Sequence, residues 1–177
     1  MLSTYLRWGA ISGGVMLVVA ALSFLFIGRL DASTYGIAEI AGYTSIILGL
    51  AVIWFAVARR FSGDAAAAGL WDRIRLGLGI AFVAGLIFAA FDTLYSFVLN
   101  PGFMQSYYDY YLSTLPVQSG PEYDRLVAEL EAQRAMFGSP LAIFFVMAVT
   151  VWAAGIVISV LVALIHKYLV GGRVKAA

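Results

Sequence analysis

Four apolar stretches in this sequence are each long enough to cross a lipid bilayer. They run approximately over residues 8–27, 37–58, 76–99 and 140–165. An α-helix rises about 1.5 Å per residue, so about 20 residues cross the hydrocarbon core. Within lipid the backbone must satisfy its own hydrogen bonds, which favours helices. The sequence therefore predicts an all-α membrane protein built as an antiparallel four-helix transmembrane bundle.

Composition supports this fold class and excludes several functions. Hydrophobic residues make up 63% and charged residues 12% of the chain, against roughly 45–50% and 25% in soluble domains. We therefore expect residues 1–177 to form a single transmembrane domain. The net charge of +1 does not indicate a nucleic-acid partner. The expected partners are membrane lipids, and either a second copy of the chain or a membrane partner protein.

Cysteine and histidine content limits cofactor chemistry. The chain has no Cys and one His, His166, which excludes disulfides, thiolate nucleophiles and Cys-ligated or His-rich metal sites. No cofactor or metal is expected. At the end of the fourth stretch, His166 is expected to lie among lipid headgroups, with titration as the alternative.

The distribution of Lys and Arg predicts the orientation of the bundle. With the amino terminus inside, the inner side carries eight: Arg7, Arg59, Arg60, Arg73, Arg75, Lys167, Arg173 and Lys175. The other side carries three, Arg29, Arg125 and Arg134. Both termini are therefore predicted to lie inside. The basic loop after residue 58 serves this topology, or binds anionic headgroups. The first apolar run exceeds a secretory signal core, which predicts a retained helix.

The long polar segment between the third and fourth stretches carries its own signals. Asn100-Pro101-Gly102 should interrupt the third helix, because Pro cannot donate to the preceding turn. A tyrosine-rich stretch follows, expected at the membrane surface: Tyr107, Tyr108, Tyr110 and Tyr111.

A further helix is expected later in the same segment, on the outer side of the membrane. With Ser119 as its cap, residues 121–137 show apolar positions three and four apart, which predicts an amphipathic helix on the outer face or on the end of the bundle. Gly138 should end this helix, and Ser139-Pro140 should start the last span.

Small residues recur every fourth position along the third span. Gly77, Ala81, Gly85 and Ala89 form a ridge that favours close helix packing. Asp92 follows Gly85 by seven residues and returns to nearly the same face. We therefore expect its carboxyl group to point into a helix contact and away from lipid.

Asp92 is also the centre of a candidate polar site. An ionised carboxylate this far inside a membrane costs several kcal/mol (about 2.5 or more) unless it is paired or hydrated. The antiparallel topology places Glu39 in the same half of the bilayer, with Tyr43, Tyr95 and Arg29 as candidate partners. Two interpretations remain open. The site binds a proton, a cation or a headgroup, or the carboxyl group fixes helix register or stays neutral.

Motifs of catalysis are absent from the sequence. No G-x-S-x-G, H-E-x-x-H or P-loop pattern occurs, and Glu39 and Asp92 lack the dense clustering that metal-assisted hydrolysis needs. No catalytic residue is expected, and the sequence favours a non-enzymatic protein.

Several short motifs resemble those of one family. They open and close the second apolar stretch, follow the third and lie within the fourth: Glu39-Ile40-Ala41-Gly42-Tyr43, Phe55, Arg59-Arg60, Asn100-Pro101-Gly102-Phe103 and Gly155-Ile156-Val157-Ile158-Ser159. On these motifs, over most of its length, the chain resembles the bacterial domain-of-unknown-function family numbered 4199. The resemblance implies a small four-span protein of the bacterial inner membrane, multi-pass, with both termini cytoplasmic by the charge rule.

The resemblance also bears on residues of the candidate site. The acidic residue common before Gly-Tyr in the family maps onto Glu39. The chain departs from the family pattern at Ala41 and Gly102, where a larger or an acidic residue is more usual. The family name assigns no activity.

Two function classes follow from these observations. The first is a non-enzymatic membrane protein that acts as a scaffold, an accessory subunit or a lipid-binding protein. The alternative is a transporter or channel subunit that uses Glu39 and Asp92 as a buried polar site. Because closely packed helices leave little room for a pore in one copy, transport would require an oligomer.

Overall fold

The computed structural model describes residues 2–27, 33–62 and 68–170, and within these ranges it is helical without any strand. Four helical runs are long and apolar enough to span a membrane: Leu2–Ile27, Tyr35–Arg60, Leu70–Leu99 and Pro140–Tyr168. This confirms the predicted all-α fold with four spanning helices. The predicted outer partner Arg29 lies outside the described residues.

The elements follow in a simple order. They are α1 (Leu2–Ile27), α2 (Tyr35–Leu50), α3 (Val52–Arg60), α4 (Leu70–Leu94), η2 (Tyr95–Leu99), α5 (Phe103–Ser113), α6 (Pro121–Met136), α7 (Pro140–Ile165) and η3 (His166–Val170). Helices α2 and α3 form one span, and η2 and η3 are π-helical ends of α4 and α7. The first and third spans begin six residues earlier than predicted, because Arg7 and Asp72 continue the helices beyond their apolar parts.

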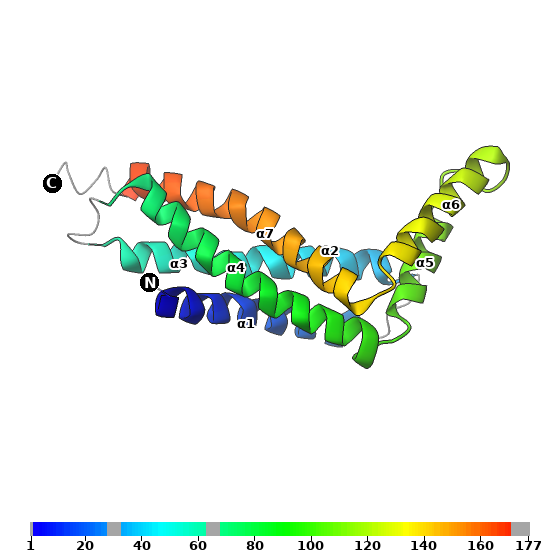
Figure 1. Cartoon of the computed structure of the whole chain (residues 1–177), viewed down its shortest axis with the longest axis horizontal. Coiled ribbons are helices and arrows are strands. Elements are labelled where there is room, and N and C mark those ends of the chain that lie inside the picture. The colour runs from blue at the N-terminus through cyan, green and yellow to red at the C-terminus, as the bar shows by residue number, and fades with distance from the viewer. Residues whose placement is uncertain (1, 28–32, 63–67, 171–177) are drawn as a thin grey trace.

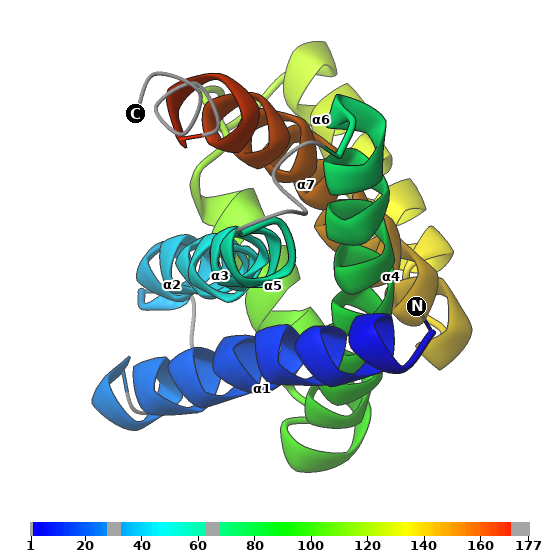
Figure 2. The ribbon, with the colours of Figure 1, turned by 90° about the vertical axis from the view of Figure 1, so that its left-hand side faces the viewer.

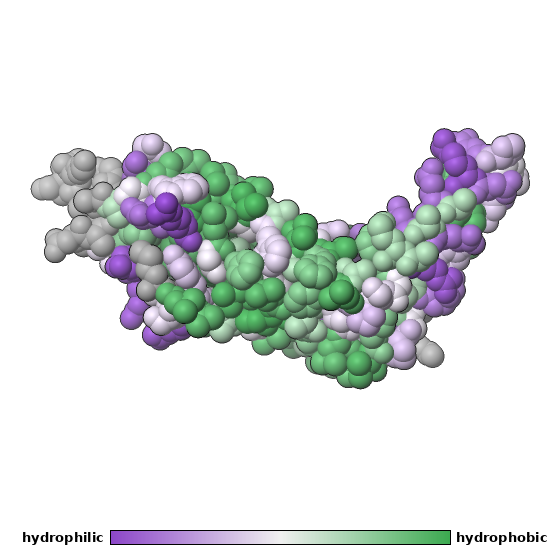
Figure 3. Space-filling model, in the orientation of Figure 1, coloured by the Kyte–Doolittle hydropathy of each residue, from purple (hydrophilic) through white to green (hydrophobic). Residues whose placement is uncertain are grey.

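The spans run alternately in opposite directions, and α4 packs against both α1 and α7 (Figure 1). Seen from one end, α1, the α2–α3 span, α4 and α7 surround a common centre (Figure 2). Met16, Leu50, Ile53, Ile80 and Val151 fill this core and are 0% exposed. Apolar side chains cover the visible face of the bundle, while hydrophilic residues lie toward its two ends (Figure 3). This pattern is what a membrane-embedded bundle requires.

The ridge of small residues on α4 lies against neighbouring helices. A Cβ atom at Gly77 would lie 2.5 Å from Ser159 Oγ on α7, and one at Gly85 would lie 2.5 Å from Trp152 Nε1. Ala81 faces Gly155, and Ala89 is fully buried. The backbones of α4 and α7 therefore approach more closely than larger residues would allow.

Helices α5 and α6 extend away from one end of the bundle (Figure 1). The predicted helix over 121–137 is present as α6; it has no buried residue and extends away from the end of the bundle (Figure 1). Its N-cap is Gly120 and not Ser119; Gly120 has a φ of 93°, a backbone conformation that favours glycine. The final span begins as predicted, since Ser139 Oγ accepts a hydrogen bond from the backbone N–H of Ala142 at 3.2 Å.

Candidate functional site

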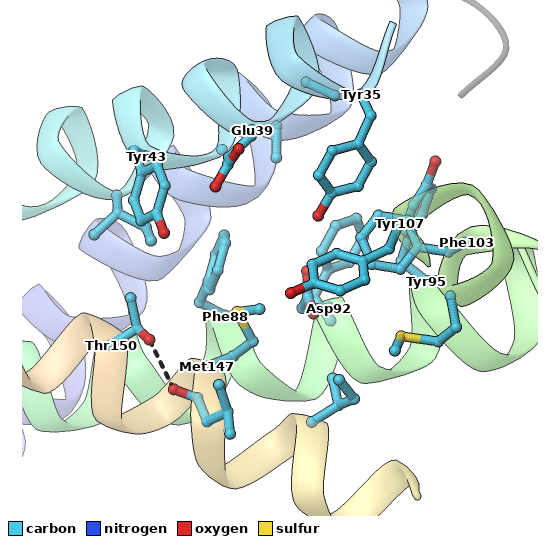
Figure 4. Close-up of a pocket in the computed structure, with 18 of the residues that line it drawn as sticks. Tyr35, Glu39, Tyr43, Phe88, Asp92, Tyr95, Phe103, Tyr107, Met147 and Thr150 are labelled. Carbon is cyan, nitrogen blue, oxygen red and sulfur yellow. Dashed lines mark hydrogen bonds between the residues drawn. The ribbon is translucent and has the colours of Figure 1, made fainter. Parts of the chain in front are cut away.

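A cavity of about 300 Å³ lies where the bundle meets α5. Its walls come from α1, α2, α4, η2, α5, α7 and the residue that follows α6 (Figure 4). The lining residues are Ala20, Phe24, Tyr35, Ala38, Glu39, Gly42, Tyr43, Ile46, Phe88, Phe91, Asp92, Tyr95, Phe103, Met104, Tyr107, Tyr111, Phe137, Ile143, Val146, Met147 and Thr150. All four residues predicted for the polar site, Glu39, Tyr43, Asp92 and Tyr95, are among them.

The two carboxyl groups reach the cavity from different helices. Glu39 on α2 is half-buried and accepts hydrogen bonds from the Tyr111 hydroxyl at 3.2 and 3.4 Å. Asp92 on α4 is also half-buried, and its Oδ2 is buried without a hydrogen-bond partner. The sequence predicted that the Asp92 carboxyl group points into a helix contact and away from lipid; the structure places Asp92 on the wall of a cavity.

About half of the residues that line the cavity are aromatic. Tyr35 lies at their centre, with ring centroids 5.5 Å from Tyr107 in a T-shaped arrangement and 5.9 Å from Phe103. Tyr95 stacks on Phe24 at 4.4 Å. Tyr35 is 8% exposed, so it is an internal residue of the site.

The environment of α5 keeps two of its tyrosines, Tyr107 and Tyr111, protonated. Burial, followed by the charge of Glu39, raises the pKa of Tyr111 to about 12. Burial also raises the pKa of Tyr107, again with a contribution from Glu39. Both hydroxyl groups therefore remain hydrogen-bond donors at neutral pH.

Sequence reasoning missed the α5 contribution to the site. The tyrosine-rich stretch was expected at the membrane surface, whereas it forms a helix whose Phe103, Tyr107 and Tyr111 line the cavity. These residues recur every four positions, the spacing of one helix face. That periodicity is the signal that indicates a packed helix in place of a surface stretch.

A second polar cluster lies at the opposite end of the bundle. Arg73 is fully buried; its Nε donates to His166 Nδ1 at 3.2 Å, and its guanidinium also donates to the carbonyl oxygens of Ala68 and Gly69. His166 is 3% exposed, with its ring against Trp54. The expectation that His166 lies among headgroups is therefore wrong, because α4 supplies a buried donor for its ring nitrogen.

Metal ligation finds little support in these side chains. Across residues 2–27, 33–62 and 68–170, no three His, Cys, Asp or Glu side chains are grouped to hold an ion. What the cavity offers is apolar and aromatic surface beside two carboxyl groups, an arrangement typical of ligand sites.

Fold and site together define a multi-pass membrane protein with a cavity near one end of the bundle. The family model described as "Protein of unknown function (DUF4199)" matches residues 7–168. The chain belongs to this family, as its short motifs indicate. No curated protein and no solved structure shows a significant match.

Proposed function

We propose that this protein is a non-enzymatic membrane protein that binds an amphipathic, lipid-like molecule in the cavity. The observation that carries the proposal is the cavity itself: about 300 Å³ of space with mainly apolar walls and two carboxyl groups inside a membrane-spanning bundle. Ligand sites are typically concave, largely apolar and supplied with a few polar groups that fix orientation. Among a scaffold, an accessory subunit and a lipid-binding protein, this geometry favours the last.

The walls favour an occupant with an apolar part. Phe88, Phe91 and Met147 offer rings and a flexible thioether, which adapt to hydrocarbon of varied shape. Glu39 and Asp92 lie at the side of this surface and interact with the polar part. An amphipathic molecule satisfies both features at once, whereas a fully polar solute would leave the aromatic walls unused.

The proposed location is the bacterial inner membrane, with both termini in the cytoplasm and the cavity toward the outer side. The excess of Lys and Arg at the end opposite α5 supports this orientation. Because the chain has no Cys, single-cysteine variants give a clean test. Gln118→Cys should react with an impermeant maleimide added to intact cells, and Ser62→Cys should react only after permeabilisation. The reverse pattern would invert the orientation.

Filling the cavity tests the binding proposal. Gly42 lines the cavity, and a Cβ atom there meets nothing within 4 Å, so Gly42→Phe should place a ring in the space without breaking a helix contact. Gly14→Phe is the matched control, because Gly14 on α1 is equally open but does not line the cavity. A diazirine-bearing alkyl probe should crosslink to cavity residues in the wild type and in Gly14→Phe, but not in Gly42→Phe. Equal crosslinking in all three would refute the proposal.

Transport is the second candidate, favoured by the presence of Glu39 and Asp92 in one cavity. Below the cavity, Leu50, Ile53, Ile80 and Val151 are fully buried, so a path through one copy would need these residues to move apart. Proteoliposomes provide the test: proton or cation flux that Asp92→Asn abolishes would support transport. A lack of flux for every cation tested and under every pH gradient would exclude transport.

A further inference from the structure

We infer that the cavity selects an organic ammonium ion, a primary amine or quaternary ammonium group that carries an apolar substituent. This inference rests on the proposed binding function and names the chemistry of its ligand. Four features carry it: the sign of the charges at the cavity, the carboxylate oxygen without a partner, the aromatic walls, and the shortage of ligands for an inorganic ion.

The charges that line the cavity have one sign. Glu39 and Asp92 are acidic, and no Lys, Arg or His of the described residues lines the space. Ionised carboxyl groups in a membrane cavity are poorly solvated. A bound cation removes this penalty, so the cavity favours positive charge over neutral or negative charge.

Two residues that line the cavity carry a polar group without a hydrogen-bond partner among the described contacts. Asp92 Oδ2 is buried and makes no hydrogen bond. Tyr35 is 8% exposed and directs its hydroxyl group into the cavity (Figure 4), and among the described contacts this hydroxyl makes no hydrogen bond. Buried polar groups are normally paired. A ligand with a charged head would therefore supply the partner that these groups lack in the protein alone.

Four of the rings that line the cavity form two pairs that meet at steep angles. Tyr35 and Tyr107 meet at 85° with centroids 5.5 Å apart, and Tyr95 and Phe103 meet at 74° with centroids 6.1 Å apart. Rings that border one space in different orientations resemble the walls of an aromatic cage. Such cages bind ammonium groups through cation–π attraction, in which the face of a tyrosine ring attracts the positive charge.

An inorganic cation fits this lining less well. Ca²⁺ takes about six to eight oxygen ligands, and Mg²⁺ requires a near-octahedral set. The cavity offers the carboxyl groups of Glu39 and Asp92 and a few hydroxyl groups, and Thr150 already uses its hydroxyl to donate to Val146 O at 2.8 Å. An organic ammonium ion needs few oxygen ligands, because its apolar substituents pack against the aromatic rings.

Calorimetric titration in neutral maltoside micelles tests the charge preference. The probe is hexyltrimethylammonium, with hexyl sulfate as the matched anion. The ammonium probe should bind at least about tenfold more tightly than the sulfate. Glu39→Gln and Asp92→Asn should each weaken ammonium binding about tenfold, roughly the value of one charged contact. Tyr107→Leu should weaken it severalfold through loss of a ring face.

Glu131→Gln is the control variant, because Glu131 is an exposed carboxylate near the same end of the molecule that does not line the cavity. It should leave ammonium binding unchanged. Circular dichroism and gel filtration should show that every variant is folded. If one of the two carboxylate variants is unfolded, the other carboxylate variant and Tyr107→Leu are used to test the inference.

Competition identifies the source of the ammonium group. Displacement of the probe by phosphatidylethanolamine, but not by phosphatidylglycerol, would support a lipid headgroup. Displacement by hexylamine, with both lipids ineffective, would support a small free amine. Either result supports an ammonium site, and failure of every ammonium compound to displace the probe would overturn it.

Two results would overturn the inference while leaving the proposed function intact. Hexyl sulfate could bind as tightly as the ammonium probe, or both carboxylate variants could bind the ammonium probe as the folded wild type does. In each case Gly42→Phe would still abolish crosslinking of the alkyl probe. If Gly42→Phe had no effect on that crosslinking, the binding function itself would fail.

Discussion

Tyr111 donates a hydrogen bond to Glu39 across 72 residues of sequence, with Tyr111 Oη 3.2 Å from Glu39 Oε1. The contact joins α5, which lies outside the spans, to the carboxyl group on α2 that lines the cavity. It also brings Tyr111 against Tyr35, with ring centroids 6.1 Å apart. One hydroxyl group therefore helps to position both the end of the bundle and the polar side of the site.

Removing this hydroxyl should loosen α5. We expect Tyr111→Phe to keep the ring contacts, lose one half-buried hydrogen bond and lower the free energy of unfolding by about 0.5–1.5 kcal/mol. Amide hydrogen exchange across residues 103–113 should become faster. Tyr123→Phe on α6 is the control and should change neither measurement. Unchanged exchange in Tyr111→Phe would mean that the rings alone hold α5.

Alkaline pH should act on the same contact. The pKa of Tyr111 is raised to about 12 in the folded protein, against about 10 in an unfolded chain. The stability that Tyr111 contributes by staying protonated in the folded protein is therefore fully present below pH 10 and is lost as the pH rises from 10 through 12. We expect the thermal midpoint to fall over this range, and to fall less in Tyr111→Phe. Equal decreases in the two proteins would assign the effect to other groups.

Close packing of α4 on α7 gives a prediction for stability alone. At Gly77 a Cβ atom would meet Ser159 Oγ at 2.5 Å and Ser159 Cβ at 2.7 Å. Gly77→Ala should therefore separate the helices and cost about 1–3 kcal/mol of unfolding free energy. Gly42→Ala, which meets nothing within 4 Å, should not destabilise the protein, because alanine favours helix by about 1 kcal/mol. SDS titration followed by circular dichroism measures both.

The apolar stretches of the sequence predicted the four spans, because a backbone in lipid must satisfy its own hydrogen bonds and therefore forms helices. Because successive spans run in opposite directions, the sequence also placed Glu39 and Asp92 in the same half of the bundle. It could not predict the cavity. Whether Asp92 meets a helix or an open space depends on how far α2 and α7 lie from α4, and no single residue encodes that separation. The role of α5 was missed because Phe103, Tyr107 and Tyr111 show their common face only once the segment is read as a helix.

The pair at the other end of the bundle should be structural. His166 accepts from Arg73 Nε at 3.2 Å, so His166→Phe removes one hydrogen-bond acceptor of the buried Arg73 guanidinium. We expect a loss of about 1–3 kcal/mol in unfolding free energy for this variant. Lys167→Met, a neighbouring change without such a contact, should have little effect. Binding of the ammonium probe should be unchanged in both variants, and a loss of binding in folded His166→Phe would show coupling between the two ends.

Substitution of Asp92 distinguishes a functional role of this carboxyl group from a structural role. Because Asp92 Oδ2 is buried without a hydrogen-bond partner, the ionised group costs the folded protein more than a neutral amide does. Asp92→Asn should therefore raise the free energy of unfolding by about 1 kcal/mol while weakening ligand binding, the pattern expected where a protein gives up stability for function. Asp124→Asn, an exposed change on α6, should alter neither property. If Asp92→Asn instead destabilises the bundle and leaves binding intact, Asp92 fixes the register of the helices.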